Sequence, residues 1–286
     1  MKKQPETYLE PQMIIADVIR AFEQWANPDW QESWDNCGWQ VETGISHETA
    51  GILVCLTPTL AVMHEAIALK AEGFPINLIF AHHPLIFGRL SSVVAGDSVG
   101  DMVRLAIAHD IAIYTAHTNF DQVKDGTADV LAQLLDLQAV RPVVSTAPDT
   151  VLSGDKIRGY GRVGNLPASL SLQQLLEKIH SILAPPHLLY SPSADLQQRI
   201  EKLAVLGGSG ASYIDSVKKT GAQAYLTADC KFHQFQASRD QNLILIDAGH
   251  YATERPACER LVSWFKQQGA AWVQLSEQDE DFRQFF

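Results

Sequence analysis

Short runs of apolar residues alternate with longer amphipathic stretches along most of the chain. In the first half, apolar runs at residues 51–56, 77–81 and 111–115 predict buried strands, and amphipathic stretches at 59–72, 98–109 and 128–137 predict helices. Gly73 and Pro75 mark the end of the first of these helices. This order is typical of βα units stacked on a mainly parallel sheet, so we expect an α/β fold.

The second half repeats this rhythm after a break. Residues 142–155 are rich in Pro, Ser, Thr and Asp and predict a linker or exposed loop. Behind them, 158–163 predicts an edge strand and 171–183 a helix, and further strands and helices alternate at 203–207, 211–219, 224–227, 230–237, 243–247 and 255–268. We therefore expect two similar three-layer α/β/α domains, residues 1–140 and 141–286, with the C-terminal part of the second packing back on the first.

The composition is that of an ordinary globular protein. The 286 residues are 46% hydrophobic, and 33 acidic against 22 basic residues give a net charge of −11. This charge argues against bulk nucleic-acid binding but permits a small anionic ligand bound at a metal. No apolar segment follows Lys2 and Lys3, and no run is long enough to span a bilayer, so we expect a cytoplasmic protein. The four cysteines lack the close spacing of a zinc or redox motif.

Polar side chains follow three of the predicted strands, where ligands of α/β folds usually bind. The first group is His82 and His83, which precede Pro84. Successive residues inside a strand point to opposite faces, but a strand end that turns at a proline can direct both imidazoles into one site. The alternative is one solvent-facing and one packed histidine.

The second group runs from His117 to Asp121, again directly behind an apolar strand. Asp121 offers a hard oxygen ligand that could bridge two cations, while His117 or Asn119 could orient ligands. Alternatively, Asp121 is a turn residue or helix N-cap ahead of Gly126.

The third group contains His250 and Glu254, four residues apart behind the last predicted strand. If a helix already includes His250, both side chains lie on one helix face. If the helix starts at Thr253, Gly249 lets the loop fold His250 back beside the helix N-terminus. Pro256 suits a first helical turn, so we expect the second arrangement. The alternative for Glu254 is a solvated carboxylate near the positive end of the helix dipole.

Two further motifs are candidates for ligand or proton handling. Residues Gly207, Gly208, Ser209 and Gly210 lie between a predicted strand and helix, where backbone N–H groups could bind a phosphate; a tight turn is the alternative. Asp229 and His233 are four apart, and as helical neighbours they could face the metals as proton carriers. The alternative is a surface capping Asp and a packed His.

The chain resembles the Nif-three-like dinuclear metal-centre family, whose members are named GTP cyclohydrolase I type 2 homologues. The matching segments run in family order over roughly residues 12–270 and are Trp34-Asp35-Asn36-Cys37-Gly38-Trp39-Gln40-Val41, His82-His83-Pro84, His117-Thr118-Asn119-Phe120-Asp121, Leu206-Gly207-Gly208-Ser209-Gly210, Leu226-Thr227-Ala228-Asp229 with His233, and Gly249-His250-Tyr251 with Glu254. Ala228 departs from this pattern, because the family usually has glycine there.

The resemblance implies a pair of divalent metal ions about 3.5 Å apart in the cleft between two similar domains. Their ligands would be His82, His83, Asp121, His250 and Glu254, and the metal would be zinc, iron, manganese or magnesium. The resemblance also implies a toroidal homo-hexamer with its sites facing an internal cavity.

From these residues we expect metal-assisted hydrolysis of a small nucleotide-like or phosphorylated substrate, with Asp229, His233 or His117 assisting proton transfer. The resemblance would make the substrate GTP. The alternative is a non-catalytic hexamer that stores or delivers metal or serves as a scaffold. A glycine-loop nucleotide binder without metal is a third possibility.

Overall fold

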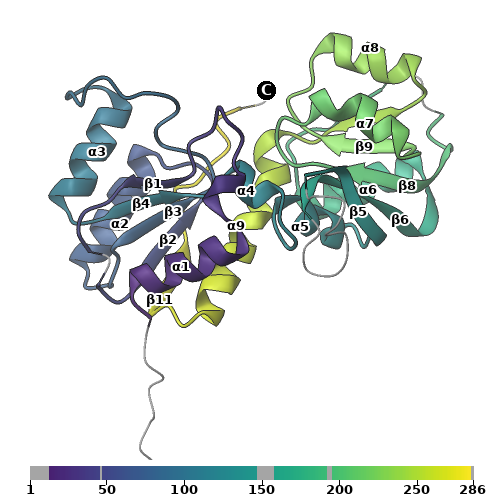
Figure 1. Ribbon diagram of the computed structural model, residues 1–286. Helices are drawn as coiled ribbons and strands as arrows, with labels where there is room; N and C mark the ends of the chain where they lie inside the picture. Colours follow the sequence, from purple (N-terminus) through teal and green to yellow (C-terminus); the bar gives the residue numbers. More distant parts are fainter. Residues whose placement is uncertain (1–12, 46, 147–157, 192–194, 285–286) are drawn as a thin grey trace, which may run out of the picture. The chain divides into compact units, whose positions relative to one another are not determined.

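The fold is described from a computed structural model of the chain, which covers residues 13–45, 47–146, 158–191 and 195–284. The chain forms two compact units, each with its own sheet and helices (Figure 1). The first contains the residues up to His117 together with Cys258–Asp279, and the second contains Thr118–Ala257 together with the residues from Glu280 onward. This confirms the expected α/β class with two domains.

The first unit is built on a five-stranded sheet in the order β1-β4-β3-β2-β11. The strands are β1 (Gly38–Val41), β2 (Gly51–Cys55), β3 (Leu78–Ala81), β4 (Ala112–Thr115) and β11 (Trp272–Leu275). Strands β4, β3, β2 and β11 are parallel, whereas β1 runs antiparallel to β4. The prediction of β2, β3 and β4 is confirmed, but β1 and β11 were not predicted.

Helices cover both faces of this sheet. On one face, α2 (Leu60–Ala71) and α3 (Ser98–Ala108) pack on alternate strand residues such as Leu53, Ile79 and Ile113. On the other face, Phe22 of α1 (Ile15–Trp25) and Phe265 of α9 (His250–Gln267) contact Phe80. The period of two along each strand thus produces three layers, as the alternation of apolar runs and amphipathic stretches predicts.

The strand ends of the first unit are level with one another. Cys55 lies opposite Ala81, and Ala81 lies opposite Thr115. The residues that follow β3 and β4 therefore leave the sheet at the same edge, which brings His82 and His117 close together although they are far apart in sequence.

The second unit has a mixed six-stranded sheet in the order β5-β6-β8-β9-β10-β7. The strands are β5 (Gln138–Ser145), β6 (Gly159–Ser171), β7 (Leu189–Tyr190), β8 (Arg199–Val205), β9 (Ala224–Thr227) and β10 (Ile244–Asp247). Only β8, β9 and β10 are parallel to one another; β5, β6 and β7 pair antiparallel. Three predicted strands thus form the parallel centre of this sheet.

Two predictions in this region were wrong. Residues 142–145 belong to β5 rather than to a linker, while 147–155 lie outside the described residues. The segment predicted as an edge strand at 158–163 is the start of β6, which pairs with β5 on one side and β8 on the other. The physical reason is that β6 has an antiparallel partner on each side, so its backbone N–H and C=O groups are paired within the sheet. Arg162 of β6 is accordingly buried, with 1% of its surface exposed.

The second sheet is also covered on both faces. Side chains of α5 (Thr127–Leu134) and α6 (Leu172–Leu183) pack in a core with β8, β9 and β10. The 3-10 helix η4 (Ala211–Tyr213), α7 (Ile214–Lys219) and the partly buried Phe235 of α8 (Phe232–Asp240) belong to the core of the other face. Two further short helices are η1 (Pro28–Trp30), a 3-10 helix in the first unit, and α4 (Thr118–Asp121) in the second. Among the described residues, no helix is both long and apolar enough to cross a membrane.

Candidate metal centre

Three histidines of the first unit form a cluster at the carboxyl ends of β3 and β4. The ring centroids of His82 and His83 lie 5.2 Å apart, those of His82 and His117 also 5.2 Å, and those of His83 and His117 5.6 Å. One nitrogen of each ring lies within 4.8 Å of a nitrogen of the other two, which is close enough for the three rings to bind one metal ion. His82 is buried, whereas His83 and His117 are partly exposed.

Each of these imidazoles is held through its Nδ1 atom by an oxygen atom. His82 Nδ1 donates to the carbonyl oxygen of Ala116 at 2.8 Å, His83 Nδ1 lies 2.8 Å from the Thr57 hydroxyl, and His117 Nδ1 lies 2.9 Å from Asp35 Oδ1. A carbonyl oxygen can only accept, so neutral His82 carries its proton on Nδ1 and a lone pair on Nε2. This arrangement is typical of metal-binding histidines, whose other nitrogen bonds an oxygen.

Asp35 supports this cluster from the loop that precedes β1. Its side chain is fully buried, and it accepts hydrogen bonds from the Asn36 amide at 2.9 Å and from the Cys37 thiol at 3.4 Å. These donors stabilise a buried carboxylate, which in turn orients His117. Asp35 was not predicted as a site residue; its place in the Trp34–Val41 motif was the only signal.

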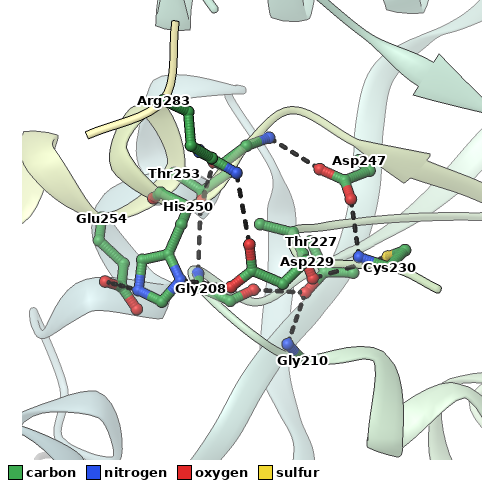
Figure 2. A network of polar contacts seen from close by, with 12 residues as sticks. Gly208, Gly210, Thr227, Asp229, Cys230, Asp247, His250, Thr253, Glu254 and Arg283 are labelled. Atoms are coloured by element: carbon green, nitrogen blue, oxygen red, sulfur yellow. Dashed lines mark hydrogen bonds and ion pairs between the residues drawn. The ribbon is translucent and has the colours of Figure 1, made fainter. Parts of the chain in front are cut away.

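His250 and Glu254 form the corresponding group of the second unit (Figure 2). Helix α9 begins at His250, so the expectation that it starts at Thr253 was wrong and the alternative, with both side chains on one helix face, is confirmed. His250 Nε2 lies 2.8 Å from Glu254 Oε2. Gly249 causes the early start, because it adopts a left-handed conformation (φ +82°), its N–H donates to Asp247, and its carbonyl accepts from the Thr253 N–H.

The ring of His250 lies between two carboxylates, as Figure 2 shows. Its Nδ1 atom lies 2.6 Å from Asp229 Oδ2, opposite the contact of Nε2 with Glu254. Burial lowers the pKa of His250, but hydrogen bonds and charge from Asp229 and Glu254 outweigh it and raise the pKa to about 10. The hydrogen bond from His250 likewise holds the pKa of Asp229 below its ordinary value. In the absence of metal, His250 is therefore protonated at neutral pH.

Arg283 extends this network from the end of the described chain. Its Nη1 atom donates to Asp229 at 3.4 Å, and its Nε and Nη2 atoms donate to the two oxygens of Asp281 at 3.1 and 3.2 Å. The hydrogen bond to Asp281 raises the pKa of Arg283, which is ionised at any physiological pH. The sequence carried no signal for this contact, since Asp229 and Arg283 are 54 residues apart.

The glycine loop lies against Glu254 rather than at an open helix end. The Gly208 N–H donates to the Thr253 hydroxyl and the Gly210 N–H to the Thr227 hydroxyl, each at 3.0 Å. Two of the amides expected to bind phosphate are thus used inside the protein, which favours the tight-turn alternative for Gly207, Gly208, Ser209 and Gly210. A Cβ atom on Gly208 would lie 2.0 Å from Glu254 Oε1, so glycine makes room for this carboxylate.

The remaining predicted site residues are placed as follows. Asp229 lies before α8 with a positive φ of 54° and His233 lies on the exposed side of α8, so the expectation that they are neighbours on one helix was wrong. The reason is that the chain turns at Asp229 before the helix begins. Asp121 is the last residue of α4 and accepts a hydrogen bond from the Thr127 hydroxyl at 2.5 Å, and Asn119 is buried on the same helix.

The donor atoms of both units fit a divalent metal ion. Imidazole nitrogens and a buried carboxylate are the mixture that zinc, iron and manganese accept. His250 would have to release its proton before Nε2 could bind a metal, which couples metal binding to pH.

Comparisons with known proteins place the chain among its relatives. The family model described as Duf34/NIF3 (NGG1p interacting factor 3) matches residues 13–280. A protein of Nostoc sp. named GTP cyclohydrolase 1 type 2 homolog is 64% identical over 274 residues, covering 96% of this chain and 99% of the relative. A Schizosaccharomyces pombe protein named NIF3 homolog is 29% identical over 277 residues, covering 94% and 96%.

Solved structures show the same fold. A Bacillus cereus protein related to NIF3 superposes with a TM-score of 0.83 at 22% identity and covers 96% of this chain and 100% of its own. Reduced HcgD from Methanocaldococcus jannaschii superposes with a TM-score of 0.76 at 26% identity, covering 93% of this chain and 98% of its own. The family resemblance seen in the sequence is thereby confirmed, as is the two-domain α/β fold.

Proposed function

Because the chain belongs to the Duf34/NIF3 family, we propose that it is a metal-dependent hydrolase acting on a small nucleotide-like or phosphorylated compound. Its metal ligands are His82 and His83 in the first unit and Asp121, His250 and Glu254 in the second. The observation that carries the proposal is that His82 and His83, each held at Nδ1 by an oxygen, lie at metal-ligand spacing in one cluster with His117, because such anchoring leaves the Nε2 atoms of His82 and His83 available as ligands.

Bound divalent ions would polarise substrate oxygen atoms and stabilise the negative charge that develops during hydrolysis. The protein's own residues supply the rest. Asp35 and Asp229 hold His117 and His250 in place, and Asp229 is the better supported proton-handling residue because it already shares a proton with His250. The name of the Nostoc relative, GTP cyclohydrolase 1 type 2 homolog, supports a nucleotide-like substrate.

The assembly is part of the same proposal. We expect a homo-hexamer, as the family resemblance implies, with two divalent ions per chain. The measurement is native mass spectrometry of the purified protein under conditions that preserve bound metal.

Elemental analysis of protein purified without chelators tests the metal-binding half of the proposal. About two equivalents of zinc, iron or manganese per chain support it, whereas a protein that contains none and takes up none on reconstitution contradicts it. The reaction is then tested by incubating the metal-loaded protein with GTP and with simple phosphoesters and analysing the products. A protein that holds metal but turns over none of them would contradict the hydrolase and favour the storage or scaffold alternative.

A further inference from the structure

Two aromatic side chains lie exposed beside the histidine cluster of the first unit. Trp34 is 58% exposed and Phe87 is 59% exposed. Their rings are nearly parallel, with centroids 6.4 Å apart and an interplanar angle of 12°. Single exposed apolar residues are common and need no explanation, but a stacked pair that leaves more than half of each side chain in water is a preformed flat apolar surface.

This pair adjoins the candidate ligands. The centroid of Trp34 lies 6.0 Å from that of His117, the centroid of Phe87 lies at the same distance, and both rings meet the imidazole at 78°. His117 belongs to the cluster with His82 and His83. A flat molecule stacked on Trp34 or Phe87 is therefore held next to the histidines.

The loops that carry the two rings are tied together by amide side chains. Asn36 Nδ2 donates to the carbonyl oxygen of Ile86 at 2.9 Å, and the Ile86 N–H donates to Gln40 Oε1 at 3.0 Å. Gln40 Nε2 in turn donates to the Asn36 carbonyl at 2.8 Å. These bonds join the residues after Trp34 to the residue before Phe87, so the relative position of the rings is set before a ligand arrives, which reduces the entropy lost on binding.

The chemistry of the surface selects its ligand. Aromatic faces bind planar heterocycles by stacking, at about 1–3 kcal/mol per base, and they tolerate different bases because every base has a π face. The net charge of −11 disfavours a nucleic-acid polymer, so a free nucleotide or nucleoside suits the surface better.

We infer that Trp34 and Phe87 form a stacking platform for the planar heterocyclic ring of the substrate. The platform would hold a nucleobase beside His117, so we infer that the substrate of the proposed metal site is a nucleotide or nucleoside. Its role in turnover rests on the proposed function, whereas its affinity for a ring does not.

Calorimetric titration of the full-length protein, chelated and metal-loaded, tests the platform. The probes are GMP, AMP and ribose 5-phosphate, the last of which has the phosphate but no ring. We expect both nucleotides to bind at least about tenfold more tightly than ribose 5-phosphate, and Trp34→Ala and Phe87→Ala each to weaken GMP binding by about 5- to 100-fold. Trp34→Phe should restore the affinity to within roughly threefold, since it keeps an aromatic face.

Phe232→Ala is the matched control, because Phe232 is 88% exposed on α8 of the second unit. It should leave GMP binding unchanged, and all four variants should keep the wild-type metal content. Equal affinity for GMP and ribose 5-phosphate, or alanine variants that bind GMP as the wild type does, would overturn the platform. If the protein nevertheless holds its full metal content, the proposed function would be unaffected. A protein that takes up no metal but binds GMP through Trp34 and Phe87 would show the reverse.

Discussion

The histidines of the two units are held by different kinds of partner. In the first unit, His82 is held by a backbone carbonyl, His83 by a hydroxyl and His117 by the carboxylate of Asp35. In the second unit, His250 lies between the carboxylates of Asp229 and Glu254.

The partner of each imidazole determines the protonation state in which it would meet a metal ion. A carbonyl acceptor fixes the neutral tautomer of His82 and leaves Nε2 as a base. Two carboxylates instead stabilise protonated His250, so that a metal has to displace a proton before it can bind. The Ala116 carbonyl thus leaves His82 ready as a neutral base, whereas the charge of two carboxylates would oppose metal binding at His250 until its proton is lost.

The largest expected effect comes from removing one ligand in each unit. We expect His82→Ala and Glu254→Gln each to weaken metal binding by more than about 100-fold while the circular dichroism spectrum stays that of the wild type, since His82 directly follows β3 and glutamine keeps the size of the Glu254 side chain. Elemental analysis after dialysis against a weak chelator measures this. Either variant retaining its full metal content would remove that residue from the ligand set.

A smaller but more specific effect is expected for Gly208→Ala. The new Cβ would lie 2.0 Å from Glu254 Oε1 at a φ of +64°, so Glu254 has to move and the metal content should fall towards that of Glu254→Gln. Gly221→Ala is the control, because Gly221 has a similar φ of +79° but the atom nearest to its new Cβ, Lys202 Nζ, would be 3.9 Å away. Both variants should be destabilised by about 1 kcal/mol through backbone strain. Equal metal content in the two variants would contradict the role assigned to the loop.

The charge difference predicts a pH dependence that belongs to the second unit. The pKa of His250 is raised to about 10 in the folded protein, above its ordinary value of 6.5, so protonation stabilises the fold fully below pH about 6.5 and the stabilisation is lost as the pH rises towards 10. We expect the free energy of unfolding of the chelated protein, measured by urea denaturation, to fall by roughly 1–3 kcal/mol over this pH range, a figure reduced for the partial exposure of His250.

Asp229→Asn should remove much of this slope, and His250→Gln should remove nearly all of it. Comparing each variant with the wild type cancels the other groups that titrate between pH 6.5 and 10. A wild-type slope that survives both replacements would mean that His250 is not the group responsible.

The smallest expected effect is that of Arg283→Gln. Arg283 contacts Asp229 at 3.4 Å and remains 37% exposed, so losing its charge should weaken metal binding only about threefold. Arg283→Lys should recover part of the loss at low salt, and the difference between the two should shrink as ionic strength rises. A salt-independent effect would indicate packing instead of charge.

Much of the fold could be predicted because the parallel strands are short, apolar and followed by amphipathic helices. Of the antiparallel strands, the start of β6 was predicted, but as an edge strand, and β1, β5 and β7 were not predicted. Pro142 suggests a loop, but β5 is an edge strand of its sheet, where a missing N–H is tolerated. Arg162 suggests exposure, but it is buried because Asp129 and three carbonyl oxygens accept from its guanidinium.

In the candidate site, contacts between residues close in sequence could be predicted, whereas contacts between distant residues could not. His82 with His83 and His250 with Glu254 are one and four residues apart, so local geometry brings each pair together. His117 meets Asp35 across 82 residues, and Asp229 meets His250 across 21, contacts that depend on which strand ends are level in the folded sheet. Pro256 misled the prediction of the α9 start, because the capping at Gly249 and Thr253 outweighed the loss of one helical hydrogen bond.

The discontinuity of the first unit determines the order in which the chain can mature during synthesis. Strand β11 pairs in parallel with β2, so Trp272 lies opposite Gly51 and Leu275 opposite Val54. The ribosome synthesises all of residues 118–257 before β11 exists, so β2 has β3 on one edge but still lacks its partner on the other. The first unit therefore stays incomplete until most of the second has been synthesised, and until then β2 exposes an apolar strand edge that invites aggregation.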